Sequence, residues 1–191
     1  GEIAFAYDLR QLKASGVLDA LQVTSASPAL EPFYKAESAP FTGYDLDALL
    51  ATNDRIGTID RTAHSLRFVC IDGYRTVYPF KAIEGGRGVV AFRKGTKGAP
   101  AWPSTKRGRK EETAAPYYLV WDKETYDKHR PWPYQLTRIE IVRNASLAAA
   151  HAPPADAKVD VGYSLFKTHC IACHAVNMKG GKMGPELNVP Q

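Results

Sequence analysis

Short stretches in which apolar and polar residues alternate are spread over the middle of this chain, a pattern typical of strands with one buried face. The clearest are 66–71 and 76–80, which flank Asp72-Gly73, a dipeptide that favours a tight hairpin turn. Short apolar runs rich in β-branched and aromatic residues predict further strands at 89–92, 117–121 and 136–142. The middle of the chain is therefore predicted to form a sheet.

Two stretches near the start of the chain have apolar residues at helical intervals instead. Within 5–21 the leucines follow this spacing, although Gly16 weakens it, and 43–50 carries Asp45 and Asp47, whose charges favour a helix N-terminus. Helices and strands are interspersed without the regular alternation of a parallel sheet. For residues 1–144 we therefore predict an α+β fold, a mixed α/β-sheet domain.

A segment rich in alanine and proline follows at 145–157 and shows no apolar period. Such a composition is typical of a semi-rigid linker. The chain is thus predicted to consist of an N-terminal domain, 1–144, this linker, and a short C-terminal segment, 158–191.

The overall composition, with 45% hydrophobic and 24% charged residues, is that of an ordinary globular protein. No apolar run approaches the roughly 18–20 residues that a membrane-spanning helix needs, so we expect no transmembrane segment. The first residues do not look like a signal peptide, and we interpret the chain as a mature or trimmed one.

The net charge of +5 comes from one part of the chain. Eight basic residues and no acidic residue lie between Arg87 and Lys110, and the remainder of the chain is net acidic. Glycines and prolines in this segment predict a loop. It is either a solvated insertion or a docking patch for an acidic redox partner, because opposite surface charges steer association. Nucleic-acid binding is not expected, since no recognition module accompanies the charge.

The sequence Cys170-Ile171-Ala172-Cys173-His174 is a CxxCH motif, the attachment site for c-type haem. Its two thiols can each form a thioether with a porphyrin vinyl group, and His174 follows closely enough to bind the iron. The alternative is a structural zinc site or a disulfide. A zinc site would want a second ligand pair, and the chain has three cysteines in all. We therefore predict covalent haem c, anchored by Cys170 and Cys173, with His174 as the proximal ligand.

The residues around this motif resemble the first half of a class I cytochrome c domain. Gly162-Tyr163-Ser164-Leu165-Phe166 leads a short amphipathic helix into the motif, and Gly180-Gly181 with Met183-Gly184-Pro185-Glu186-Leu187 forms a glycine-rich loop ending in GPxL. The resemblance implies an all-α segment in which the Pro185 carbonyl accepts a hydrogen bond from the axial histidine. It also implies a periplasmic or otherwise exported protein, because haem is attached covalently outside the cytoplasm.

A distal ligand for the iron is not evident, because only 17 residues follow His174. Met178 and Met183 both fall within the proximal loop by the GPxL match, His169 is poorly aimed beside the first cysteine, and His151 lies in the linker. We expect the cytochrome segment to be incomplete, with the chain ending inside a longer domain.

Four segments of the N-terminal domain resemble, in order, the sulfite-oxidase-type molybdopterin domain; they are 41–50, 67–80, 116–121 and 132–141. The resemblance implies that Cys70, followed by Asp72 and Tyr74, ligates molybdenum through its thiolate. The alternative, which we favour, is that Cys70 is a buried structural thiol, since free cysteine is among the most buried residue types. The domain is much shorter than the catalytic members, and segments to cradle the pterin are not evident. We therefore expect it to lack molybdopterin.

Three functions are compatible with these motifs. The first is a periplasmic electron-transfer cytochrome, alone or as a subunit of a larger complex, in which the N-terminal domain is a docking module or scaffold. The second is a molybdenum-dependent oxidoreductase in which Cys70 holds the metal and electrons pass to the haem. The third is a haem-based sensor of small ligands. We favour the first, an electron-transfer protein rather than a stand-alone enzyme.

Overall fold

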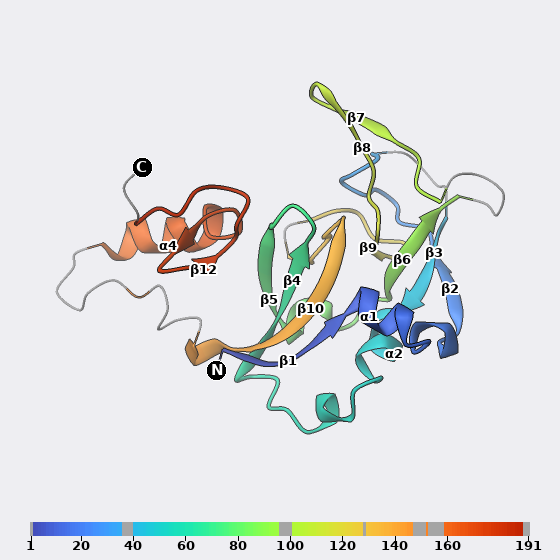
Figure 1. Cartoon of the computed structure of the whole chain (residues 1–191), viewed down its shortest axis with the longest axis horizontal. Coiled ribbons are helices and arrows are strands. Elements are labelled where there is room, and N and C mark those ends of the chain that lie inside the picture. The colour runs from blue at the N-terminus through green and yellow to red at the C-terminus, as the bar shows by residue number, and fades with distance from the viewer. Residues whose placement is uncertain are drawn as a thin grey trace.

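The computed structural model describes residues 2–35, 40–95, 101–127, 129–146, 152 and 159–188. Within these residues the strands form two four-stranded and two two-stranded sheets, in which all paired strands are antiparallel (Figure 1). The first sheet has the order β1 (Ile3–Asp8), β10 (Leu136–Arg143), β4 (His64–Cys70) and β5 (Arg75–Pro79). The second has the order β2 (Val23–Ala26), β3 (Phe41–Asp45), β6 (Gly88–Lys94) and β9 (Tyr118–Trp121). Two hairpins form the smaller sheets, β7 (Thr105–Arg107) with β8 (Lys110–Glu112), and β11 (Ala175–Val176) with β12 (Lys179–Gly180).

The helices are short. They include α1 (Leu9–Ala14), α2 (Leu46–Leu50) and α4 (Asp160–His169), together with the 3₁₀ turns η1 (Leu18–Ala20), η2 (Asp54–Gly57) and η3 (Phe80–Ile83), and residues 144–146 are helical as well. The described residues contain no helix that is both long enough and apolar enough to cross a bilayer.

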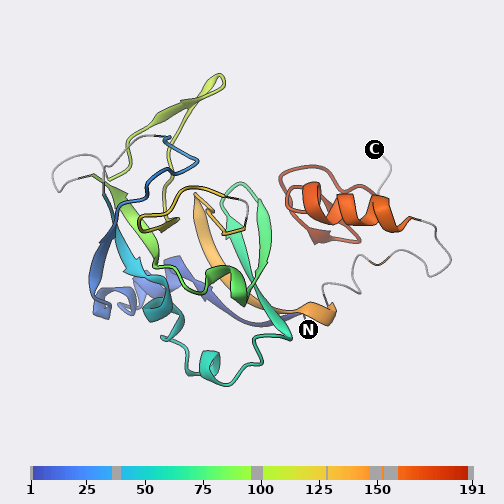
Figure 2. The same cartoon turned by 180° about the vertical axis from the view of Figure 1, so that it is seen from behind.

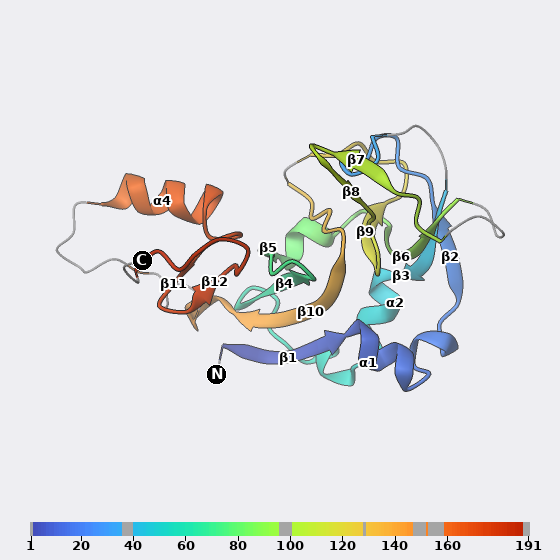
Figure 3. The same cartoon turned by 45° about the horizontal axis from the view of Figure 1, so that its top comes forward.

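One apolar core joins the two large sheets. Leu66 and Phe68 of β4 enter this core together with Tyr118 of β9, and all three are fully buried. The intervening residue Arg67 is also buried but lies outside the core, because successive residues of a strand point to opposite faces. The second face of the first sheet is therefore polar, and the C-terminal segment lies beside this sheet (Figure 2, Figure 3).

The α+β prediction is wrong, because the N-terminal domain is mostly β. The expected helix over 5–21 begins instead with β1, in which Phe5 and Tyr7 are buried against β10. Within 5–21 the α-helix is limited to α1. Asp8 caps it, because its carboxylate accepts a hydrogen bond from the Gln11 N–H at 3.0 Å. Pairing with β10 decided the state of residues whose apolar spacing also suited a helix.

The second expected helix is likewise shorter than the pattern suggested. Residues up to Asp45 belong to β3, and only α2 is helical. Asp45 caps α2 by accepting from the Ala48 N–H at 3.0 Å. By contrast, the predicted strands and the hairpin at Asp72-Gly73 are confirmed as β4, β5, β6, β9 and β10.

The prediction of an all-α C-terminal segment is also wrong. The expected helix is present as α4, but the hairpin β11–β12 follows it. Asn177 and Met178 take positive φ values of 52° and 60°, which is the conformation of a tight two-residue hairpin turn. Most of the predicted linker, 145–157, lies outside the described residues.

Candidate haem-attachment site and the cavity beside Cys70

The CxxCH motif forms a turn at the end of α4. Asp160 in the first turn of α4 complements the helix dipole, and the helix ends where the Cys170 N–H donates to the Phe166 carbonyl at 3.0 Å. The N–H groups of Cys173 and His174 then donate to the Cys170 carbonyl at 3.1 and 2.8 Å. This turn brings two free, half-buried thiols and an imidazole together on one short piece of chain.

The imidazole of His174 is held by the loop that follows. Its Nδ1 lies 2.9 Å from the carbonyl oxygen of Pro185, so the contact that the cytochrome resemblance implies is present. Gly184 packs so closely on the ring that a Cβ at this position would overlap it. Gly181 similarly approaches the Ala172 carbonyl without room for a Cβ. These glycines let the loop close over the motif.

This arrangement has the donor set that haem c requires. With Nδ1 facing the Pro185 carbonyl, Nε2 is the ring nitrogen of His174 left for an iron ion. No group of three His, Cys, Asp or Glu side chains that could hold a metal occurs among the described residues. The ligand roles of Cys170, Cys173 and His174 stay predictions.

The structure offers little for the distal side. Met178 sits at the β11–β12 turn with 79% of its surface exposed, and Met183 is 50% exposed. His169 is exposed at the end of α4, whereas His151 lies outside the described residues. For the three described candidates, Met178, Met183 and His169, the structure shows no hydrogen bond or ion pair to His174.

The described C-terminal residues 159–188, which we call the cytochrome-like segment after its sequence resemblance, dock on the β4–β5 hairpin. The Arg75 N–H of edge strand β5 donates to the Ala172 carbonyl at 2.9 Å, and the Lys182 N–H donates to the Gly73 carbonyl at 2.9 Å. Gly73 has a positive φ of 89°, and Lys182 lies directly against it. The segment thus satisfies backbone groups that an uncovered sheet edge would leave to solvent.

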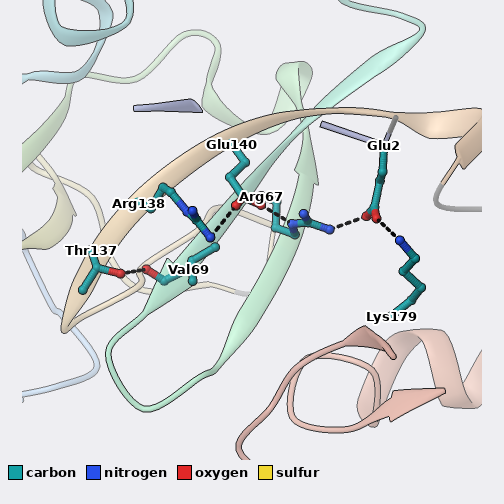
Figure 4. Close-up of polar contacts among 7 residues, drawn as sticks. All are labelled: Glu2, Arg67, Val69, Thr137, Arg138, Glu140 and Lys179. Carbon is teal, nitrogen blue, oxygen red and sulfur yellow. Dashed lines mark hydrogen bonds and ion pairs between the residues drawn. The ribbon is translucent and has the colours of Figure 1, made fainter. Parts of the chain in front are cut away.

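A chain of charges crosses the same contact (Figure 4). Lys179 of β12 pairs with Glu2 at 3.2 Å, Glu2 pairs with Arg67, and Arg67 pairs with Glu140 at 2.5 Å. Glu140 also accepts from Arg138 at 2.8 Å. Burial alone would raise the pKa of Glu2, but Arg67 and Lys179 together hold it below the ordinary value. The network links the segment to the polar face of the first sheet.

Cys70 lies at a cavity of about 320 Å³ between the N-terminal sheet and the cytochrome-like segment. Asp72 and Tyr74 line the same cavity, and so does Cys173 of the CxxCH motif. Cys70 is only 5% exposed. Burial, with a smaller contribution from the Asp72 charge, raises the pKa of its thiol to about 12. The structure therefore brings the two sequence candidates, Cys70 and Cys173, to one cavity.

Molybdopterin fits this cavity poorly. The volume of the cavity is near the lower end of the range of roughly 300–1,000 Å³ for small-molecule sites. This space is small for a fused pterin with a phosphate. Of the two arginines that line it, Arg130 already pairs with Glu124 at 2.7 Å and donates to the Glu84 carbonyl at 3.0 Å. A protonated Cys70 is consistent with a buried structural thiol.

The basic segment between Arg87 and Lys110 is not the simple loop that the sequence predicts. It contains β6 and β7, and Lys94 is buried with its Nζ 4.3 Å from the centre of the Phe41 ring. Arg87 lies 3.6 Å from Asp122. Within the described residues, the other exposed positive charges of this segment lie on the projecting β7–β8 hairpin (Figure 1). The same hairpin also carries Glu111 and Glu112.

Neither a comparison with protein-family models nor a search of curated proteins finds a match for this chain. The two family resemblances therefore rest on sequence motifs and on the geometry above. Sequence reasoning assigned neither Arg75 nor Trp132 to a site, and it interpreted Gly73 only as part of a turn. These residues form the docking contact and the cavity wall. The glycine of the Asp72-Gly73 turn was the one available signal, but it predicts a turn and not what packs on it.

Proposed function

We propose that this protein is a c-type cytochrome that carries single electrons through haem attached to Cys170 and Cys173, with His174 as the proximal ligand. The observation that carries the proposal is the 2.9 Å contact between His174 Nδ1 and the Pro185 carbonyl. A neutral imidazole that donates through Nδ1 presents Nε2 as a ligand, and the acceptor makes that nitrogen a better donor to a metal.

Bound haem would supply the reversible one-electron chemistry of its iron. The residues of this chain would supply the rest. Pro185 fixes the ring orientation and tautomer of His174, and Gly184 provides the space in which the loop packs on that ring. The apolar side chains Val161 and Leu165 of α4, which are 77% and 55% exposed, are surface that a porphyrin or a further element could cover.

In this proposal the N-terminal domain is a scaffold that holds the cytochrome-like segment through Arg75, Gly73 and Glu2. The β7–β8 hairpin would be the docking point for an acidic redox partner. Attachment of haem would place the protein in the periplasm or another exported compartment. Opposite charge on the partner would raise the association rate more than the affinity.

The test is expression with and without a c-type haem maturation system, followed by mass spectrometry and absorption spectra. The native protein should gain the mass of one haem only with maturation, and reduction should sharpen its visible bands. Cys173→Ala should lose one of the two thioether bonds, whereas the matched variant Cys70→Ala should attach haem normally. A polypeptide that leaves maturation with both motif thiols free would refute the proposal.

The molybdenum enzyme that the resemblance around Cys70 suggests is the less favoured candidate, because the cavity is small for molybdopterin and burial keeps the pKa of the Cys70 thiol high. Metal analysis tests it for the case in which Cys70 does hold molybdenum. In that case purified protein should contain molybdenum and iron in equal amounts, and Cys70→Ala should remove the molybdenum alone. The third candidate, a haem-based sensor, requires an open iron site. A reduced spectrum that does not change with carbon monoxide would count against it.

A further inference from the structure

The cavity beside Cys70 has one wall from each part of the chain. Cys70 and Tyr74 belong to the β4–β5 hairpin, whereas Cys173 and Met183 belong to the cytochrome-like segment. Most of the lining comes from the N-terminal part, and the docked segment completes the wall with Cys173 and Met183. A molecule bound there would therefore contact both parts.

One wall carries a buried donor that lacks a partner. Trp132 is 7% exposed and lines the cavity, and its indole Nε1 has no hydrogen-bond acceptor among the described residues. The comparable nitrogen of Trp121 donates to the Pro131 carbonyl at 2.7 Å. A buried indole N–H almost always finds an acceptor, and leaving it without one costs about 1–3 kcal/mol.

A positive charge lies at the same cavity. The guanidinium of Arg107 stands 5.0 Å from the centre of the Phe33 ring and 5.2 Å from that of Tyr134. Within the described part of the chain no carboxylate forms an ion pair with Arg107, in contrast to Arg130. Arg107 is therefore the cavity's available cation.

The remaining wall is largely aromatic. The rings of Tyr74, Tyr78 and Tyr126 line it, and Pro133 adds apolar surface. Asp72 is the acidic residue of the lining, and its charge adds to burial in raising the pKa of the Cys70 thiol. An anionic group would thus be repelled from the Cys70 end and attracted to Arg107.

We propose that this cavity binds a small aromatic carboxylate, with its carboxylate at Arg107 and the Trp132 N–H and its ring among the tyrosines. The aromatic lining favours a planar organic body over an inorganic oxyanion, and the volume of about 320 Å³ limits the ligand to a single small ring system.

Ligand binding in this cavity would also change the redox potential of the haem, and this part of the inference rests on the proposed function. A carboxylate held at Arg107, in the cavity that Cys173 also lines, would stabilise the more positive ferric form of a haem attached to that cysteine, so its binding would lower the potential. By linkage, the ligand binds the oxidised protein more tightly by the same free energy. A tenfold preference corresponds to a shift of about 59 mV for one electron.

The direct test is calorimetric titration of the haem-loaded protein with benzoate, benzyl alcohol and acetate at constant ionic strength. Benzoate should bind, and each of the other two should bind at least about tenfold more weakly. Arg107→Gln should weaken benzoate binding about tenfold or more, whereas Arg109→Gln, which removes an exposed charge from the same hairpin, should leave it unchanged. Asp72→Asn should strengthen it.

A second readout uses the thiol of Cys70. Benzoate should slow the alkylation of Cys70, located by peptide mass spectrometry, and Trp132→Phe should abolish this protection. Equal binding of benzyl alcohol, equal effects of Arg107→Gln and Arg109→Gln, or no protection of Cys70 would each overturn the proposal. The failure of haem attachment and the failure of the cavity proposal can be told apart by counting the reactive thiols in unfolded protein. Three free thiols would refute haem attachment, and the benzoate titration would still test the cavity.

Discussion

Replacing Glu140 by glutamine is the sharpest test of the charged network in Figure 4. Glu140 is 1% exposed and accepts from Arg67 at 2.5 Å and from Arg138 at 2.8 Å. Removing its charge leaves the buried Arg67 with Glu2 as its remaining carboxylate. The loss of one partner from a buried ion pair costs about 3–5 kcal/mol, and the retained Glu2 places Glu140→Gln near 3 kcal/mol.

Urea denaturation followed by circular dichroism measures this cost, and for a chain of this size the melting temperature should fall by about 6–12 °C. Arg138→Gln is the matched control, because 38% of that side chain is exposed and its pair should contribute about 1 kcal/mol or less. The double variant Arg67→Met, Glu140→Leu should be more stable than Glu140→Gln, since it leaves no buried charge without a partner: Glu2 keeps Lys179, and the Arg138 side chain is 38% exposed. A cost for Glu140→Gln no larger than that of the control would refute the reasoning.

Three further variants test other parts of the structure. Gly184→Ala should reduce the yield of haem-loaded protein, because its Cβ would overlap the His174 ring; Gly162→Ala, in open space on α4, should be neutral or stabilise by up to about 1 kcal/mol. Because the pKa of Cys70 is raised to about 12, its stabilising effect is complete below the ordinary value of 9.0 and is lost as pH rises towards 12. The wild type should therefore lose up to about 4 kcal/mol more than Cys70→Ala over that interval, measured by urea denaturation at each pH. Burial lowers the pKa of Lys94, whose Nζ has no hydrogen-bond partner in the described structure, so Lys94→Met should match or exceed the wild-type stability at pH 7; a clear loss would contradict this.

Local patterns were sufficient for the strands and for the CxxCH motif. The alternation around Asp72-Gly73 predicted β4 and β5 because a dipeptide that favours a turn and a period of two residues are both local properties. The pattern failed at 5–21, where leucines at helical intervals coexist with Phe5 and Tyr7 at strand intervals. Only the presence of β10 as a partner decides between the two, and that partner lies more than a hundred residues away in sequence.

The amino-acid sequence by itself determined which chemistry this chain can offer: two thiols and an imidazole in one pentapeptide, and a third thiol beside a turn. The tertiary structure alone decided where these groups lie. It placed Cys173 and Cys70 at one cavity, and it joined the C-terminal segment to the first sheet through Gly73 and Arg75. The reason is physical, because ligand chemistry belongs to individual side chains, whereas a cavity and a docked edge strand require the packing of residues far apart in the chain.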